Sequence, residues 1–352
     1  MNQPKFNVLG LMSGTSLDGL DICYSQIWKV NEKWHFSIIH AETIAYSEAW
    51  KTGLQNAHLL ADKDLKGLSS QFGLFLGEAV IDFMERNVVS DLDFIGSHGH
   101  TVLHQPEKKI TLQIGNGPEI FNKTGIPVIC DFRVQDVLLG GQGAPLVPIG
   151  DELLFADYAA CLNLGGFANV SMRNDGKRIA FDICPVNIVM NALSEKLGHA
   201  YDINGNIARS GNLIPNLLEE LNGLAFYTQH PPKSLGREWL EENILPLLIG
   251  YTNIPDVLRT FCEHVAFQIA AILRPINGEI LVTGGGAFNG YLIARINALS
   301  KKNLLVPDEK LVNFKEALVF AFLGVLRELN EVNCLSAVTG ATRNHSSGRV
   351  YK

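Results

Sequence analysis

The stretch GLMSGTSLDGLDICYSQ, residues Gly10–Gln26, decides the first structural element of this 352-residue chain. Apolar residues run up to Met12, small and polar residues follow, and from Leu20 onward apolar and polar residues alternate again. Such alternation predicts a strand, so the stretch predicts two strands joined by a glycine-rich turn. Glycine lets the main chain approach an anion and point N–H groups at it. The turn is therefore a candidate phosphate loop without the lysine of a Walker motif, and an ordinary tight turn is the alternative.

A similar order of residues returns about half the chain later, in residues 159–183 (AACLNLGGFANVSMRNDGKRIAFDI). An apolar strand runs into Gly165 and Gly166, an alternating strand follows, and Asn-Asp-Gly-Lys predicts a hairpin turn before a third strand. Repetition at this spacing predicts a duplicated domain. We therefore expect two glycine hairpins that face one cleft and clamp a polyphosphate from both sides, with two plain β-turns as the alternative.

The rest of the chain alternates between strand and helix patterns, which predicts an α/β fold. The clearest predicted elements are strands at 6–12, 20–28 and 34–43 and helices at 68–86 and 256–273.

A domain boundary is predicted near residue 145. Glycines and prolines are too dense in GGQGAPLVP, Gly140–Pro148, for regular structure. The predicted domains are therefore 1–145 and 146–352, with the ligand cleft between them.

Composition limits the function classes. Hydrophobic residues make up 47% and charged residues 18% of the chain, which is typical of globular domains. The net charge of −7 argues against a nucleic-acid partner, because phosphate backbones require clustered Lys and Arg. Six scattered cysteines without a C-x-x-C pair favour reduced thiols over disulfides or a zinc site. No leader pattern and no apolar run of about 18 residues is present, so we expect a soluble cytoplasmic protein without a membrane partner.

Two motifs of the second half are candidates for ligand chemistry. Asp182 ends an apolar strand, where ligands tend to bind in open α/β sheets, and could act as a general base. Capping of a helix that starts near Asn187 is the alternative role for this residue. VTGGGAFNG, Val282–Gly290, combines a strand, three glycines and a helix start, and we interpret it as an adenosine pocket.

The first half contributes histidines and a charged pair. DFIGSHGHTVLHQP reads as a buried strand that runs into a loop with His98, His100 and His104. Hydrogen bonding to a polar substrate is favoured over metal binding, because no further ligand lies close in sequence. Arg133 and Asp136 form either a surface pair or a substrate contact in which the arginine holds a carboxylate. The cysteines are interpreted as packing residues.

Eight segments of the chain together resemble one enzyme family. They are GLMSGTSLDGLD, GSHGHTVLHQP, TLQIGNG, GGQGAPLVP, NLGGFANV, PPKSLGRE, VTGGGAFN and AVTGA, in this order between Gly10 and Ala341. In this respect the chain is similar to the anhydro-N-acetylmuramic acid kinases. The resemblance implies a duplicated two-domain actin/hexokinase-like (ribonuclease H-like) ATPase fold. It also implies a cytoplasmic homodimer that uses ATP and Mg²⁺ to open the 1,6-anhydro ring of an amino sugar and phosphorylate O6 in peptidoglycan recycling.

The resemblance also implies roles for individual residues. Asp182 matches the aspartate that activates water, and Glu316 matches an acidic residue near the substrate. Asp18 is the expected indirect Mg²⁺ contact, since hard cations prefer carboxylate and water oxygens. The expected ATP-binding residues are Gly14, Thr15, Ser16, Leu17, Asp18, Gly19, Leu20, Asp21, Gly165, Gly166, Asn169, Gly284, Gly285, Gly286 and Asn289. The expected sugar-binding residues are His98, His100, Thr101, Gln113, Arg133 and Asp136.

One departure from the family pattern leaves the sugar specificity open. After Asp182 many family members have T-G-P-G-N, whereas this chain has Ile183-Cys184-Pro185-Val186-Asn187. The change either leaves catalysis intact, which we favour, or shifts specificity by narrowing the space beside the base. A kinase for another amino sugar and a non-catalytic, nucleotide-responsive sugar-binding protein are therefore kept as alternatives.

Overall fold

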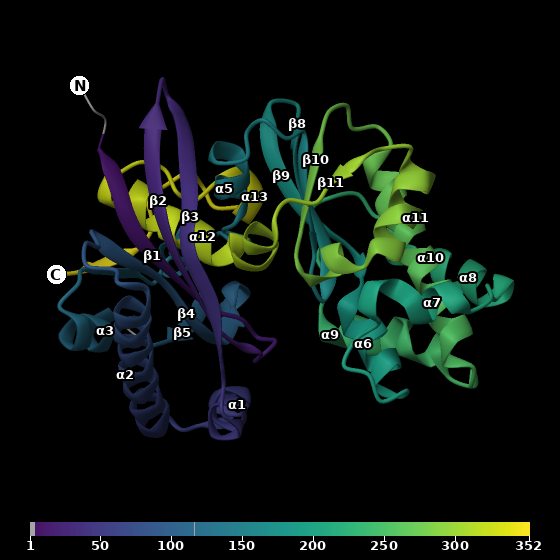
Figure 1. The fold of residues 1–352 in the computed structure, drawn as a ribbon, viewed down its shortest axis with the longest axis horizontal. Helices are drawn as coiled ribbons and strands as arrows, with labels where there is room; N and C mark the ends of the chain where they lie inside the picture. The colour runs from purple at the N-terminus through teal and green to yellow at the C-terminus, as the bar shows by residue number, and fades with distance from the viewer. Residues whose placement is uncertain (1–3, 116) are drawn as a thin grey trace. The chain divides into compact units, whose positions relative to one another are not determined.

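The strand–turn–strand predicted around residues 10–26 is present as β1 (Lys5–Ser13) and β2 (Gly19–Val30), which pair antiparallel. The structure is a computed structural model that describes residues 4–115 and 117–352. The chain forms two units, one of Met1–Leu154 with Phe314–Lys352 and one of Phe155–Asn313 (Figure 1).

The first unit is built on a mixed sheet with the order β12-β6-β4-β1-β2-β3, and β5 pairs with β4. Its further strands are β3 (Lys33–Ala45), β4 (Phe94–Gln105), β5 (Ile110–Ile114), β6 (Val128–Cys130) and β12 (Arg349–Tyr351). The first three strands form an antiparallel meander, whereas β1, β4 and β6 are parallel.

The second unit repeats this topology. Its sheet has the order β11-β10-β7-β8-β9, with an antiparallel meander of β7, β8 and β9 and parallel pairing of β7, β10 and β11. The strands are β7 (Ala160–Leu164), β8 (Phe167–Asn174), β9 (Lys177–Pro185), β10 (Ile280–Thr283) and β11 (Leu304–Leu305). In both units the third, second, first and fourth strands follow one another across the sheet, and a further parallel strand, β6 or β11, lies beside the fourth. The predicted duplicated α/β fold is therefore confirmed.

Helices complete both units. Those of the first unit are α1 (Glu48–Gln55), α2 (Asp62–Asn87), α3 (Gly117–Thr124), α4 (Val134–Leu138), α5 (Pro148–Leu153) and α13 (Ser336–Thr339). Those of the second are α6 (Asn187–Glu195), α7 (Asn206–Ser210), α8 (Pro215–Asn222), α9 (Arg237–Asn243), α10 (Ile254–Leu273) and α11 (Gly290–Ser300). The last long helix, α12 (Glu309–Glu328), begins in the second unit and continues in the first.

The alternation along β1 sets the two faces of the first sheet. Leu9 and Leu11 are buried in one cluster with Phe72 of α2. Gly10 faces the opposite way, toward α12, where an added Cβ would lie 1.9 Å from the main-chain oxygen of Ala317. Only a glycine permits this close approach of the helix to the strand. The two sets of contacts show that α12 covers the face of the sheet opposite to α2 (Figure 1).

The structure corrects the predicted domain boundary. The first unit continues past residue 145 to Leu154, and Phe314–Lys352 packs with the first unit instead of the second. The physical reason is twofold: α12 lies against the glycines of β1 and β4, and β12 pairs with β6. The histidine segment also differs from expectation, because it remains a strand as far as Gln105 through pairing with β5.

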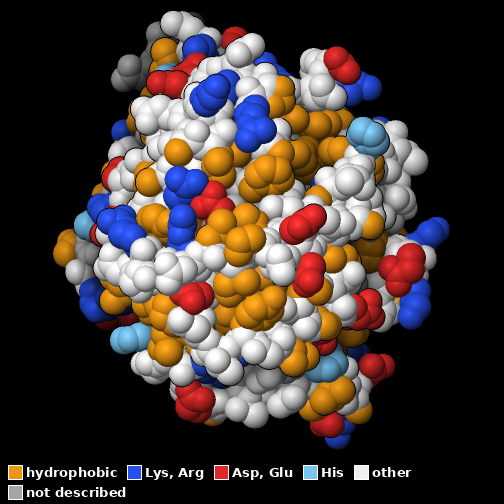
Figure 2. Space-filling model, turned by 90° about the vertical axis from the view of Figure 1, so that its right-hand side faces the viewer, with side chains coloured by type: hydrophobic (Ala, Val, Ile, Leu, Met, Phe, Trp, Pro, Cys, Tyr) orange, Lys and Arg blue, Asp and Glu red, His pale blue; other side chains and the backbone are white. Residues whose placement is uncertain are grey.

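Figure 2 shows one face of the molecule. On this face, groups of hydrophobic side chains are interspersed with acidic and basic ones. Within the described residues, none of the helices is both long enough and apolar enough to span a bilayer.

Candidate functional site

The first glycine hairpin presents small polar side chains to solvent. In the turn between β1 and β2, the N–H of Leu17 donates to the oxygen of Gly14 at 3.3 Å, and Leu17 has a φ of +61°. Thr15, Ser16 and Asp18 are exposed. The hairpin thus places two hydroxyls and a carboxylate beside glycine main chain that carries no side chain, as the sequence predicted.

The base of this hairpin is fixed by a buried hydrogen-bond chain. The Tyr46 hydroxyl donates to Ser13 Oγ at 2.6 Å, and Ser13 Oγ lies 2.9 Å from His100 Nδ1. Ser13 Oγ therefore joins the Tyr46 hydroxyl to the imidazole ring of His100. Burial lowers the pKa of His100 to about 4, so the ring is neutral near pH 7.

Two carboxylates lie close together at the start of β2. Asp21 accepts a hydrogen bond from Thr43 Oγ1 at 2.6 Å. Burial raises the pKa of Asp21, and the negative charge of Asp18 raises it further, against the effect of the Thr43 hydrogen bond. A divalent cation would offset this repulsion, and carboxylate oxygens are ligands that Mg²⁺ accepts. The donor set therefore fits Mg²⁺.

His98 and Arg133 form the second polar group of the first unit. His98 Nδ1 lies 2.9 Å from the Gly99 oxygen and so carries the proton, while Nε2 accepts from Arg133 Nε at 3.0 Å and Nη2 at 2.8 Å. Arg133 Nη1 donates to the Gly143 oxygen at 2.7 Å. Burial and the arginine charge lower the pKa of His98 well below its usual value, so this ring is also neutral. The arginine is therefore held by a histidine and by the glycine-rich loop.

Asp136 differs from both expectations for it. It is fully buried, and its Oδ2 accepts from the Gly143 N–H at 2.7 Å while its Oδ1 accepts from Thr339 Oγ1 at 2.7 Å. It therefore forms no surface pair with Arg133. Its carboxylate stabilises the glycine-rich loop at Gly143 and is too buried to contact a sugar directly. Sequence could not show this, because Thr339 is 203 residues away.

Two further predicted sugar-side residues lie on β4 and β5. Gln113 Nε2 donates to Thr101 Oγ1 at 3.3 Å and to Thr111 Oγ1 at 3.0 Å. Its buried Oε1 finds no hydrogen-bond partner among the described residues. His104 is exposed, and within the described residues the three histidines of β4 do not group as metal ligands.

Glu316 lies on α12 close enough to Arg133 and Asp21 for their charges to act on it. Surrounding protein atoms displace water from Glu316 and raise its pKa, although part of the residue is exposed. The positive charge of Arg133 lowers this pKa, and the negative charge of Asp21 raises it. The neighbouring Lys315 is instead buried and pairs with Asp151 at 2.6 Å. Glu316 is thus an accessible carboxylate beside an arginine.

In the second unit, the Gly165–Gly166 turn is tied to the start of α6. The Val186 N–H donates to the Gly166 oxygen at 2.8 Å, and Asn187 Nδ2 donates to the Leu164 oxygen at 3.0 Å. These bonds occupy carbonyl groups of the turn. The second hairpin predicted from the sequence is therefore present and joined to the strand that carries Asp182.

Asp182 is a half-buried carboxylate opposite Asn169 of β8. Its Oδ2 accepts from the Leu235 N–H at 2.8 Å, and its own N–H donates to the Lys233 oxygen at 3.1 Å. Burial raises the pKa of Asp182, against the effect of the Leu235 hydrogen bond. The residue before α6 is Val186, without a side-chain cap, so the helix-capping alternative for Asp182 is wrong. The segment around Lys233 and Leu235 received no role from sequence reasoning, and its contact to Asp182 is nonlocal.

The residues that depart from the family pattern are buried. Cys184 and Val186 have no exposed surface and belong to the core of the second unit. Burial also raises the pKa of the Cys184 thiol, which supports its interpretation as a packing residue.

A pocket of about 420 Å³ lies within the second unit. It is lined by Asn187, Met190, Asn191, Tyr201, Asp202, Asn204, Gly285, Gly286, Phe288, Asn289, Glu309 and Asn313. Gly284, next to it, has a φ of +83°, and an added Cβ would lie 2.6 Å from Asn163 Oδ1. Asn289 accepts from the Leu292 N–H at 3.0 Å and so caps α11. The wall at 201–204 was missed, because no motif marks it; its exposed Tyr201 offers a flat aromatic surface.

Comparisons with known proteins give one family. Residues 6–352 match the family model described as anhydro-N-acetylmuramic acid kinase. The chain is 34% identical to the protein of that name from Acinetobacter baylyi, covering 95% of this chain and 96% of the relative. It is also 34% identical to those from Shewanella denitrificans, covering 100% and 99%, and from a Sulfurovum species, covering 100% of both.

Solved structures align more weakly. The (R)-2-hydroxyglutaryl-CoA dehydratase component A of Acidaminococcus fermentans is 12% identical with a TM-score of 0.45, over 90% of this chain and 96% of that one. A glucokinase of the ROK family from Streptomyces griseus, in complex with glucose and AMPPNP, is 12% identical with a TM-score of 0.40, over 90% and 98%. At these values the alignments add nothing to the family match.

Proposed function

The chain belongs to the anhydro-N-acetylmuramic acid kinase family, and we propose that it uses ATP to open 1,6-anhydro-N-acetylmuramic acid and phosphorylate O6. The product is N-acetylmuramic acid 6-phosphate, formed in peptidoglycan recycling. The observation that carries the proposal is the Asp182 carboxylate, which is half-buried, oriented by the Leu235 N–H and raised in pKa. These are the properties of a general base.

The proposed reaction balances in one sequence of bond changes. Asp182 takes a proton from water as the water oxygen bonds to the anomeric carbon. The bond between that carbon and O6 breaks, and O6 keeps the electron pair. This oxygen then attacks the γ-phosphorus of ATP, and ADP leaves. A single base thus starts both steps, while the phosphoryl transfer depends on positioning and charge neutralisation.

We assign the nucleotide to the two hairpins and the pocket of the second unit. Residues 14–21 and Gly165, Gly166 and Asn169 are the proposed triphosphate contacts. The pocket beside Gly284–Gly286 and Asn289 is the proposed adenosine site, and its volume of about 420 Å³ supports this assignment. When bound, Mg²⁺ neutralises phosphate charge, and Asp18 would hold it through water.

The sugar is assigned to polar groups of the first unit. His100 offers its Nε2 nitrogen, and Arg133 is held in place by hydrogen bonds to His98 and Gly143. Thr101 and Gln113 add a hydroxyl and the free Oε1. Glu316 is proposed as the second catalytic carboxylate, with Arg133 beside it.

The remaining proposals concern the state of the protein in the cell. A cytoplasmic location and a homodimer are proposed from the family resemblance. The partner is a small amino sugar, in agreement with a kinase that takes an alcohol group as acceptor.

The test is a kinase assay with defined sugars. The purified protein is incubated with ATP, Mg²⁺ and 1,6-anhydro-N-acetylmuramic acid, and ADP and sugar phosphate are measured by coupled assay and mass spectrometry. N-acetylglucosamine is the matched control. A product heavier than the anhydro sugar by one water and one phosphoryl group is expected. Turnover of N-acetylglucosamine alone would instead support a kinase for another amino sugar, and no turnover of either a non-catalytic binding protein.

A further inference from the structure

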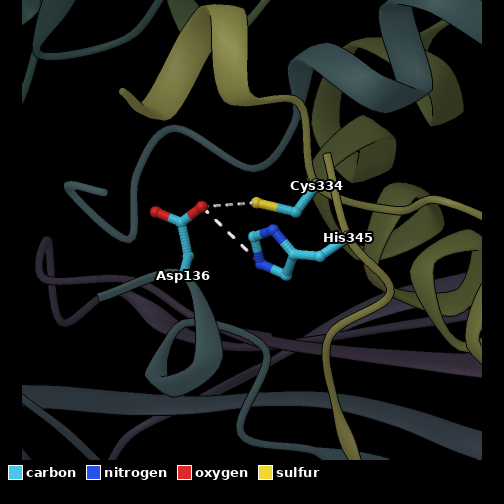
Figure 3. Close-up of side chains that lie close together, drawn as sticks. All are labelled: Asp136, Cys334 and His345. Carbon is cyan, nitrogen blue, oxygen red and sulfur yellow. Dashed lines mark hydrogen bonds and ion pairs between the residues drawn. The ribbon is translucent and has the colours of Figure 1, made fainter. Parts of the chain in front are cut away.

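Three side chains with different ligand atoms converge inside the first unit (Figure 3). They are Asp136 of α4, Cys334 before α13 and His345 after it, and all three are buried. Cys334 Sγ lies 3.0 Å from Asp136 Oδ1, and His345 Nε2 lies 3.6 Å from the same oxygen. The three ligand atoms lie within 4.8 Å of one another.

The histidine has a lone pair directed at this group. His345 Nδ1 lies 3.2 Å from the main-chain oxygen of Arg343, and because a carbonyl only accepts, Nδ1 carries the proton. In the neutral ring Nε2 then has a lone pair. Nε2 is buried and has no hydrogen-bond partner among the described residues, yet it faces a carboxylate oxygen of Asp136. The negative charge of the Asp136 carboxylate and the Nε2 lone pair repel each other in this buried place, and a cation bound between them removes the repulsion.

We propose that Asp136, Cys334 and His345 form a binding site for a divalent zinc-class cation. Ligand lengths of about 2.0 Å to nitrogen and oxygen and about 2.3 Å to sulfur, at tetrahedral angles, require ligand atoms about 3.3–3.5 Å apart. The observed separations of 3.0 and 3.6 Å from Oδ1 differ from these by a few tenths of an ångström. For these two pairs small side-chain shifts suffice, and the third pair, Cys334 Sγ and His345 Nε2, lies within 4.8 Å.

The donor set selects the kind of metal. Thiolate and imidazole favour zinc and its neighbours, whereas Mg²⁺ and Ca²⁺ require oxygen ligands. This site is thus chemically distinct from one at Asp18 and does not depend on the proposed kinase reaction. On binding, the Cys334 thiol releases the proton that it now donates to Asp136, and its sulfur bonds to the metal as thiolate. A water molecule or Thr339 Oγ1, which is 2.7 Å from Asp136 Oδ1, completes the tetrahedron.

Hydrogen bonds from the surrounding protein orient two of the proposed ligands. The proton-bearing nitrogen of a zinc-bound histidine usually donates to a carbonyl or carboxylate, as His345 Nδ1 does to Arg343. The other oxygen of Asp136 is held by the Gly143 N–H, and the Gly143 oxygen accepts from Arg133. A bound ion would therefore join the C-terminal segment to the loop that orients Arg133.

The experiment measures metal directly on the full chain. Protein produced with added zinc is purified without chelator, passed over a desalting column, and analysed by elemental mass spectrometry. About one zinc per chain is expected, as is thiolate-to-cobalt charge-transfer absorption after exchange with Co²⁺. Cys334→Ser and His345→Gln should each weaken zinc binding by about tenfold or more. Cys130→Ser, at another buried cysteine of the same unit, should keep the metal.

The outcomes are distinguishable even where a variant folds poorly. Wild-type protein that takes up neither zinc nor cobalt overturns the proposal, and so does a metal content unchanged in the folded Cys334 and His345 variants. The protonation of the His345 ring can be followed by nuclear magnetic resonance. An imidazolium paired with Asp136 in both metal-free and zinc-treated protein would also overturn the proposal of a metal site.

Discussion

Replacing Asp182 by asparagine isolates proton transfer from binding and folding. The amide of asparagine keeps an oxygen that can accept the Leu235 N–H now bound by Asp182 Oδ2 at 2.8 Å. The side chain should therefore keep its place, and only the proton acceptor is lost. Removal of a general base reduces turnover by about 10²–10⁴-fold, which corresponds to about 2.7–5.4 kcal/mol of activation free energy.

The same substitution should not destabilise the protein. Burial raises the pKa of Asp182, so the folded state holds this proton more tightly than the unfolded state. With a raised carboxyl pKa, stability is lost as pH rises from the ordinary value of 3.8 through the folded value. Asparagine cannot ionise and avoids this loss. At pH 7 the variant should therefore be as stable as the wild type or slightly more stable, with no such gain below both pKa values.

The assay pairs kinetics with thermal unfolding. The kcat is measured by ADP release with the anhydro sugar at saturation, and Tm is measured at pH 7 and at pH 3. The acidic limb of kcat/KM should lie above the ordinary carboxyl pKa and disappear in Asp182→Asn. A loss of turnover below tenfold, or a clear fall in Tm at pH 7, would refute the assignment of Asp182 as an oriented base.

Three further changes test the other parts of the site. Gly284→Ala places a Cβ 2.6 Å from Asn163 Oδ1 at a φ of +83°. It should therefore lower the free energy of unfolding by about 1–3 kcal/mol and raise the KM for ATP. An unchanged midpoint of urea unfolding would contradict this. Arg133→Lys removes the fork that donates to His98 Nε2 at 3.0 and 2.8 Å, and should raise the KM for the sugar by about tenfold to a hundredfold with the KM for ATP unchanged, as steady-state kinetics would show. Asp18→Asn should raise the Mg²⁺ concentration for half-maximal activity by about 10–100-fold in a metal titration, and equal titrations would remove Asp18 from the metal site.

Local patterns predicted the elements whose partners are near in sequence. The hairpin of β1 and β2 followed from alternation and glycine, and its repeat in β7 and β8 predicted the duplicated fold. Periodicity also predicted α10 at 256–273, which the structure has at Ile254–Leu273.

Features that depend on distant partners could not be predicted. The strand β4 extends through its histidines because β1, which is more than 80 residues away, pairs with it as far as His100 and the next strand, β5, pairs with the remainder. Asp182 is held by Leu235, which is 53 residues away, so the sequence left its local alternative as a helix cap open. Asp136 has its partners Cys334 and Thr339 about 200 residues later. No pattern near Asp136 shows that its carboxylate accepts hydrogen bonds from them.

The chain passes from one unit to the other at Leu154 and returns at Phe314, inside α12. In topological terms the second unit is an insertion into the first. A fragment that stops at residue 154 would therefore lack the helix that shields one face of its sheet and the edge strand beside β6. Excision of Phe155–Asn313 as one continuous piece, by contrast, cuts the backbone without removing any strand from the second sheet.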